Sequence, residues 1–215
     1  MKNSISLLAA AIVLSGASTA FGASSVDLTV KGLITPSACT PSLSNGGMAD
    51  YGKISAQDLP NANTPNPLPT VISLKLMVEC EATTLIAVKS TDNRPGTAYS
   101  YIPGNTPHYG LGLATGDVKI GAYMLTPTQA SGDGIPRSMI ESPDGNSWVD
   151  ATGTGWQVGW LRSLNGAVGG GASPLAVQNL EVDFNISATI APKRTLPLTT
   201  EIPLDGSATL EVVYL

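Results

Sequence analysis

Gly206-Ser-Ala-Thr-Leu-Glu-Val-Val-Tyr-Leu215 is the stretch of sequence that says most about the fold of this chain. Successive side chains of an extended strand point to opposite faces, so residues two apart share a face. One such face would carry Ala208, Leu210, Val212 and Tyr214. The pattern predicts a half-buried β-strand. Because a strand at a sheet edge presents unpaired N–H and C=O groups, we expect another segment to cover it.

The first residues have the pattern of a secretory signal peptide, residues 1–22. Lys2 supplies a positive charge, residues 7–14 form a short apolar segment, and Ala20-Phe-Gly22 is a small-x-small cleavage site. The apolar segment is too short to span a bilayer as a helix, and no later stretch is a candidate for a membrane span. We therefore expect an exported mature chain that begins at Ala23.

The overall charge and composition narrow the class of protein. The formal net charge is −5, and removal of Lys2 with the signal peptide would make it −6. A mildly acidic chain with few charges argues against a nucleic-acid partner. The 23 glycines and 16 prolines, with abundant Thr, Val and Ser, favour strands and turns. The mature length suits one β-sandwich domain.

Two cysteines, Cys39 and Cys80, lie in the mature chain. In an exported protein an even pair is most simply a disulfide, which would stabilise the fold by roughly 3 to 4 kcal/mol. A metal-binding pair is the alternative, which the single histidine and the lack of a CxxC motif make weaker. Cys80 shares the apolar face of its segment, so a bond to Cys39 would lie in the core.

Alternation of apolar and polar residues predicts further strands at residues 26–34, 49–55, 71–80, 85–89 and 180–190. Because only a short connection follows Cys80, we expect residues 85–89 to pair antiparallel with residues 71–80. Turn residues predict hairpins around 114–117 and 142–146, and loops at 59–69 and 91–108. No helical periodicity follows the signal peptide. The sequence therefore predicts an all-β sandwich with long loops.

An enzyme would need a set of acid, base or nucleophile residues that this chain does not suggest. His108 stands alone in a polar loop, where a solvated side chain explains it. Gly110 and Gly112 form a GxG motif without a following helix, so close backbone packing is the simpler explanation. We expect Asp92, Asp133 and Asp144 to cap local backbone groups in turns and to bind no metal. We predict no catalysis, metal or cofactor.

The chain has three tryptophans, Trp148, Trp156 and Trp160. They could form a stacking platform for sugars. Interior packing or the anchoring of loops is the explanation that we favour.

Several motifs, taken in order, resemble subunits of chaperone-usher fimbriae, most closely the branch often labelled β-fimbrial major subunit. Lys31-Gly32 is followed by six residues and Cys39, with the small Ala38 before that cysteine. Tyr51-Gly-Lys-Ile54 follows, then a second cysteine that closes a Leu-rich strand, and the penultimate Tyr214. The resemblance covers nearly the whole mature chain; no single motif is specific, but their order and spacing are.

The resemblance implies an immunoglobulin-like sandwich, residues 36–215, that lacks its last strand. A periplasmic chaperone would first lend a strand to the resulting groove, and the N-terminal extension of the next subunit would replace it at an outer-membrane usher. Residues 23–35 would be this donor extension, with Val26, Leu28 and Val30 as donor side chains. Ala208, Leu210, Val212 and Tyr214 would line the acceptor groove or contact the chaperone. Head-to-tail donation does not close on itself, so it would build a cell-surface fimbria.

A second hypothesis is a periplasmic or secreted binding module whose own N-terminal strand completes the sandwich. It is favoured by the short N-terminal extension, in which Ser24 and Ser25 stand where further apolar alternation would be expected, and by the three tryptophans. The two hypotheses share the fold and differ in which molecule supplies the last strand.

Overall fold

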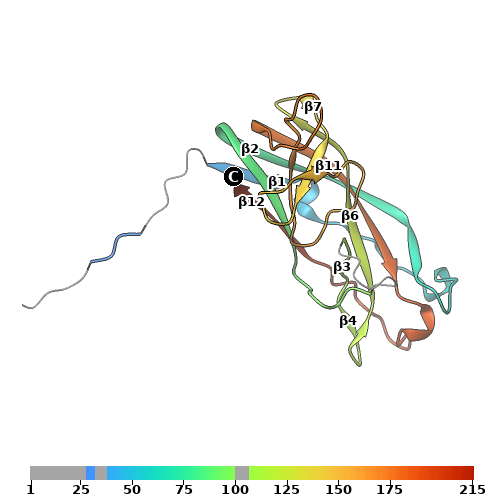
Figure 1. Cartoon of the computed structure of the whole chain (residues 1–215). Coiled ribbons are helices and arrows are strands. Elements are labelled where there is room, and N and C mark those ends of the chain that lie inside the picture. The colour runs from blue at the N-terminus through green and yellow to red at the C-terminus, as the bar shows by residue number, and fades with distance from the viewer. Residues whose placement is uncertain (1–27, 32–37, 100–106) are drawn as a thin grey trace, which may run out of the picture. The chain divides into compact units, whose positions relative to one another are not determined.

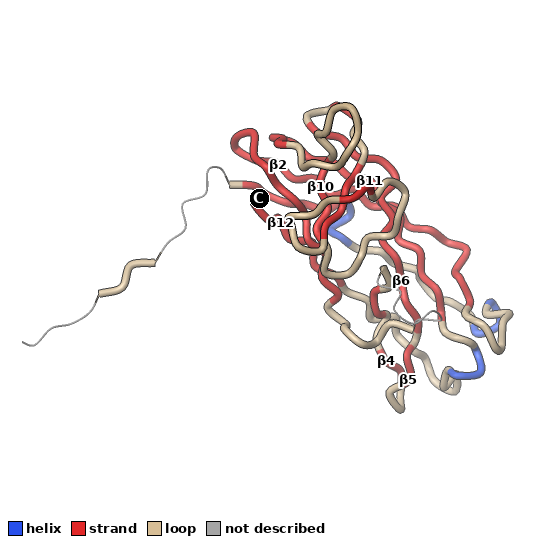
Figure 2. Tube along the Cα trace, in the orientation of Figure 1, coloured by secondary structure: helices blue, strands red, loops and turns tan. Residues whose placement is uncertain are grey.

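A computed structural model describes residues 28–31, 38–99 and 107–215 of the chain. It divides into two compact units, Met1–Ile34 and Thr35–Leu215. The described residues contain no α-helix, only short 3-10 turns among the strands (Figure 2). Among these residues, no helical segment is long and apolar enough to cross a membrane. The chain is an all-β protein built from antiparallel sheets, as its composition predicts.

The longer strands are β1 (Cys39–Leu43), β2 (Asn66–Asp92), β6 (Gly121–Gly132), β8 (Met139–Ser142), β10 (Leu161–Leu164), β11 (Ala176–Ile190) and β12 (Ala208–Tyr214). The two-residue strands are β3 (Tyr109–Gly110), β4 (Leu113–Ala114), β5 (Val118–Lys119), β7 (Ile135–Pro136) and β9 (Val149–Asp150). The 3-10 turns are η1 (Ser44–Gly47), η2 (Ala56–Asp58) and η3 (Lys193–Thr195).

The long strand β2 joins two sets of strands. Its first part pairs with β1 and β11, and β11 pairs in turn with β6, so that β2, β11 and β6 run side by side (Figure 1). Its last part pairs with β12 and β10, and β10 pairs with β8. The register against β11 breaks between the pairs Asn179↔Glu79 and Val177↔Thr84. β2 still pairs with β11 at Thr84 and Leu85, and its pairing with β12 starts at Ile86, so β2 changes partners just after this break.

One hydrophobic core is shared by both sets of strands. Alternate residues of β2 and β11 are buried, including Leu76, Val78, Val182 and Phe184, whereas the residues between them are half-buried or exposed. This period of two is what the sequence predicts for strands with one face in a core. Ile86, Val88 and Trp156 add to the same cluster.

The disulfide between Cys39 and Cys80 is confirmed. The two residues face each other in the register of β1 and β2, and their Cα atoms are 4.0 Å apart. Cys80 is buried, on the apolar face of β2 as predicted. The bond holds β1 against β2, and a disulfide is consistent with an exported protein.

Other local predictions are also confirmed. β4 pairs with β5 around residues 114–117, and β8 pairs with β9 around residues 142–146. The strand predicted at 180–190 is the second part of β11, and the terminal strand is β12. In each case the signal is local: alternating side chains, or a turn between two short strands.

Three local predictions need correction. Residues 85–89 do not pair with residues 71–80, because both belong to β2 and pair with different strands. Residues 49–55 form no strand: Gly52 has a φ of +63° and donates its N–H to Asp50, a local turn that competes with strand pairing. The loop predicted at 59–69 ends early, because β2 begins at Asn66.

Candidate functional site

The strand β12 has one paired edge and one open edge. It pairs antiparallel with β2 from Ala208↔Asp92 to Tyr214↔Ile86. Among residues 38–99 and 107–215, no strand pairs with its other edge. Ala208, Leu210 and Val212 are half-buried against the core, as the alternation predicts. β12 therefore offers unpaired backbone groups beside an apolar face.

A cavity of about 250 Å³ lies along this part of the molecule. Its floor is formed by side chains of three neighbouring strands: Leu74, Tyr123, Leu125, Phe184 and Ile186. Leu43 and Tyr51 contribute from the β1 side, and Ala208 and Leu210 contribute from β12. Nearly all of these side chains are apolar. The cavity is therefore a place where apolar side chains of another segment could be buried.

A second, larger cavity of about 940 Å³ continues from the first. Ala49, Tyr51 and Leu204 line both cavities. The second is bounded by the irregular segments 49–56 and 198–204, with Ile120 and Ile190 from the core beneath. We refer to the two cavities together as the β12 groove.

The segment that leads into β12 is held in place although the outer edge is open. Arg94 donates two hydrogen bonds of 2.8 Å to the Asp205 carboxylate, and Asp205 donates its N–H to the Leu111 carbonyl at 3.0 Å. Hydrogen bonding to Arg94 lowers the pKa of Asp205. Asn93 contacts Ser207 and Thr209 through its side chain. This wall of the groove is thus positioned before any partner binds.

The other end of β12 meets β1 beside the disulfide. The Tyr214 hydroxyl accepts the Cys39 N–H at 2.9 Å, although the Tyr214 side chain is exposed. Of the predicted groove residues, Ala208 and Leu210 line the groove, Val212 packs on the core beyond it, and Tyr214 stands at its end. The floor residues and Tyr51 were not predicted as groove residues. Alternation marks a residue as apolar, but it does not show that its side chain faces a cavity.

The predicted donor side chains are only partly within the described residues. Leu28 and Val30 have exposed side chains, and residues 28–31 form no strand within the first unit, Met1–Ile34. Val26 lies outside the described residues.

The three aspartates considered in the sequence all accept backbone hydrogen bonds. Asp144 accepts the backbone N–H groups of Asn146 and Ser147 in its own turn, and Asp92 accepts that of Arg94, so local capping is confirmed for these two. Asp133 instead accepts the N–H groups of two residues of β11, which are far away in the sequence. The donors from Ser147, Asn146 and Ser142 lower the pKa of Asp144. Within the part of the chain that the structure describes, no cluster of His, Cys, Asp or Glu could hold a metal ion.

The glycine and tryptophan predictions can also be compared with the structure. A Cβ at Gly110 would lie 2.6 Å from the Arg94 carbonyl oxygen, which confirms close backbone packing. Trp156 is fully buried, so it packs in the interior and cannot stack on a sugar. Trp148 is half-buried and donates its indole N–H to the Gly145 carbonyl at 3.1 Å, which anchors its loop. Trp160 is half-buried.

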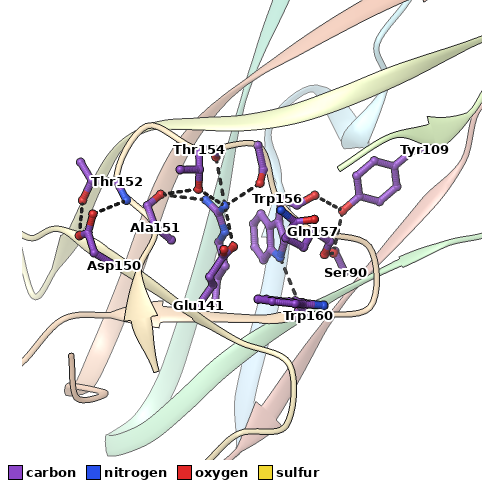
Figure 3. A network of polar contacts seen from close by, with 12 residues as sticks. Ser90, Tyr109, Glu141, Asp150, Ala151, Thr152, Thr154, Trp156, Gln157 and Trp160 are labelled. Carbon is purple, nitrogen blue, oxygen red and sulfur yellow. Dashed lines mark hydrogen bonds and ion pairs between the residues drawn. The ribbon is translucent and has the colours of Figure 1, made fainter. Parts of the chain in front are cut away.

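A buried polar network lies beside Trp156 (Figure 3). The Arg162 guanidinium is wholly buried, and its Nη2 is 3.0 Å from the Glu141 carboxylate and 2.8 Å from the Gly155 carbonyl oxygen. It also stands 5.6 Å from the centre of the Trp156 ring. Burial lowers the pKa of Arg162, and the Glu141 charge opposes this effect. Arginine stays protonated in proteins, so Arg162 keeps its positive charge and forms an ion pair with Glu141.

Comparisons with known proteins place the chain in a family. Residues 28–102 match the family described as "Protein of unknown function (DUF1120)". Over 256 aligned residues the chain is 30% identical to Protein GltF of Escherichia coli (strain K12), covering 97% of this chain and 98% of GltF. It is 28% identical to Uncharacterized protein YhcF of the same organism, covering 93% of this chain and 94% of YhcF. None of these descriptions names a fimbrial subunit, so that resemblance stays a prediction. The chain belongs to the DUF1120 family, with GltF and YhcF as relatives.

Proposed function

We propose that the chain is an exported structural subunit with an incomplete immunoglobulin-like sandwich, completed by a strand from another molecule in the β12 groove. The observation that carries the proposal is the open edge of β12 beside the apolar cavity of about 250 Å³. Strand addition suits such a site, because main-chain hydrogen bonds supply affinity and alternate side chains supply specificity.

The proposal extends to the assembly of a surface fimbria. A periplasmic chaperone would lend the first strand, and residues 23–35 of a neighbouring subunit would replace it at an outer-membrane usher, through Val26, Leu28 and Val30. The resulting contact is head-to-tail and builds a filament. Support comes from the sequence resemblance, the disulfide that holds β1, and the groove between β1 and β12. Catalysis and a cofactor have no part in this proposal.

The edges of the sheets favour β12 as the binding edge. Within the described residues of the large sheet, the other strands with a single partner are β1, with five residues, and β3, β7 and β9, with two each, whereas β12 has seven. Short edge strands protect a sheet from further pairing, and a long apolar edge invites it.

A tethered strand tests the proposal. Residues 23–34 are appended after Leu215 through a short flexible linker, so that the added strand can turn back along β12. We expect the melting temperature to rise by about 5 °C or more, because apolar donor side chains become buried in the groove. The matched control carries Leu28→Asp and Val30→Asp in the appended copy only, and should melt like the chain without the tether.

Co-export with a periplasmic chaperone of the chaperone-usher class provides the second arm. A one-to-one complex in size analysis supports the fimbrial proposal. If the tether has no effect and the chain is a monomer that unfolds when residues 23–30 are deleted, then its own N-terminal strand completes the sandwich, and the binding-module hypothesis replaces this one.

A further inference from the structure

The floor of the β12 groove is backed by the buried network of Figure 3. Arg162 holds the loop between β9 and β10 by donating hydrogen bonds to carbonyl groups of that loop. Its Nη2 is 3.1 Å from the Thr154 carbonyl oxygen and 2.8 Å from the Gly155 carbonyl oxygen. Nη1 is 3.5 Å from the Ala151 oxygen. The loop is therefore fixed by an arginine that is itself paired with Glu141.

The same loop carries Trp156, which links it to the groove. The backbone N–H of Trp156 donates a hydrogen bond to the Leu125 carbonyl at 2.7 Å, and the Leu125 side chain belongs to the groove floor. The Tyr109 hydroxyl lies 3.2 Å from the Trp156 carbonyl oxygen and 2.7 Å from Ser90 Oγ. Trp156 thus touches one floor residue directly and a second through Tyr109.

The second link passes through stacked rings. The Tyr109 and Tyr123 rings stack with their centres 5.2 Å apart, and Tyr123 lines the groove. A Cβ at Gly206 would lie 2.9 Å from the Tyr123 ring, so the segment leading into β12 rests on that ring. Tyr123 is therefore part of the groove floor, and it contacts both the segment that leads into β12 and, through Tyr109, the buried network.

We propose that Tyr109 and Trp156 are positioning residues that hold the groove floor, at Tyr123 and Leu125, in the shape that accepts a strand. The inference rests on the proposed function, since it concerns the same groove. A floor that is set before binding lowers the ordering cost of binding, so loosening it weakens the complex even where the contacts with the partner are unchanged.

The link also works in the opposite direction. If the network favours the shape that binds a strand, then a bound strand must favour the network by the same factor. Trp156 is buried in the network, so its fluorescence should respond to a strand that it does not touch.

The test compares two variants that each lose one buried hydroxyl. Tyr109→Phe keeps the stacked ring and loses the bonds to Trp156 and Ser90. Ser163→Ala loses the 2.7 Å bond to the Ile86 carbonyl, and Ser163 lines no part of the groove. The probe is a fluorescently labelled peptide with the sequence of residues 23–34, titrated into each exported chain.

We expect the two variants to melt at similarly lowered temperatures. Tyr109→Phe should bind the peptide about three- to tenfold more weakly, which corresponds to the net free energy of a typical hydrogen bond, whereas Ser163→Ala should bind like the parent chain. In a chain with Trp148→Phe and Trp160→Phe, saturating peptide should change the Trp156 emission, and adding Tyr109→Phe should reduce that change.

Equal peptide affinity in both variants, or a Trp156 emission that ignores the peptide, would overturn the positioning role while the strand site stands. A parent chain that binds neither this peptide nor the tethered strand would overturn the proposed function, and the positioning role with it.

Discussion

Two ion pairs in this chain differ mainly in their exposure to water. Arg162 and Glu141 pair inside the core, where neither charge has solvent to compensate it. Lys75 lies on the exposed face of β2, between Glu181 and Asp183 of β11, with each side chain at least a third exposed. Hydrogen bonds from Lys75 to these two carboxylates raise its pKa. The same chemistry therefore has different consequences at the two places, because removing one partner strands a charge only in the core.

Glu141→Gln should lower the free energy of unfolding on the order of 3 kcal/mol, because it leaves the Arg162 charge buried without its counter-ion. Lys75→Met is the matched control and should change it much less, because water compensates the exposed charges. Urea unfolding of both variants beside the parent chain measures the difference. Equal losses would mean that the buried pair contributes no more than an exposed one.

At the scale of the element, β12 combines a firmly held beginning with an open edge. Asn93 and Arg94, which directly follow β2, fix the residues that lead into β12, and Tyr214 fixes the far end of β12 to β1. Between these points only β2 pairs with it among the described residues. The strand is thus held in register while half of its backbone groups stay available.

The Arg94–Asp205 pair should make the stability of the chain depend on pH. Because the pKa of Asp205 is lowered, its contribution to stability is present above the ordinary carboxyl pKa of about 4 and is lost as the pH falls through the lowered value. Asp205→Asn should therefore destabilise the chain at pH 6 and matter progressively less towards pH 3. Urea unfolding across this range provides the measurement.

Arg94→Gln removes the cause of the shift and should reproduce the same pH profile. The double variant should then show little loss beyond either single one, because the two residues form one interaction. Additive losses would show that each residue acts separately.

At the scale of the whole molecule, one side of the domain combines the edge of β12 that no other described strand pairs with and the apolar β12 groove. A long exposed edge with an apolar face tends to pair with other chains. We therefore expect the exported chain alone to associate as its concentration rises, and a supplied strand to keep it monomeric.

Leu210→Lys places a charge at the groove and should shift the chain towards monomer in size-exclusion chromatography at several concentrations. Thr91→Lys is the matched control, since Thr91 is exposed on the neighbouring strand β2 and lines no part of the groove. It should associate like the parent chain. A parent chain that stays monomeric at every concentration would contradict the expected association.

What the sequence alone determined is local, apart from the disulfide, for which two cysteines allow only one pairing. Alternating side chains predicted the buried faces of β11 and β12, turn residues predicted the β4–β5 and β8–β9 hairpins, and export chemistry predicted the bond between Cys39 and Cys80. These predictions hold because a period of two and a turn signal depend only on neighbouring residues.

What only the tertiary structure decided is which segments face each other. Alternation marks residues 71–80 and 85–89 as strand but cannot say that both belong to β2 and pair with different partners. In the same way it marks Leu125, Phe184 and Ile186 as apolar without showing that the place above them is a cavity. The physical reason is that burial requires only an apolar face, whereas the choice of hydrogen-bond partner and the space left unfilled depend on how the whole chain packs.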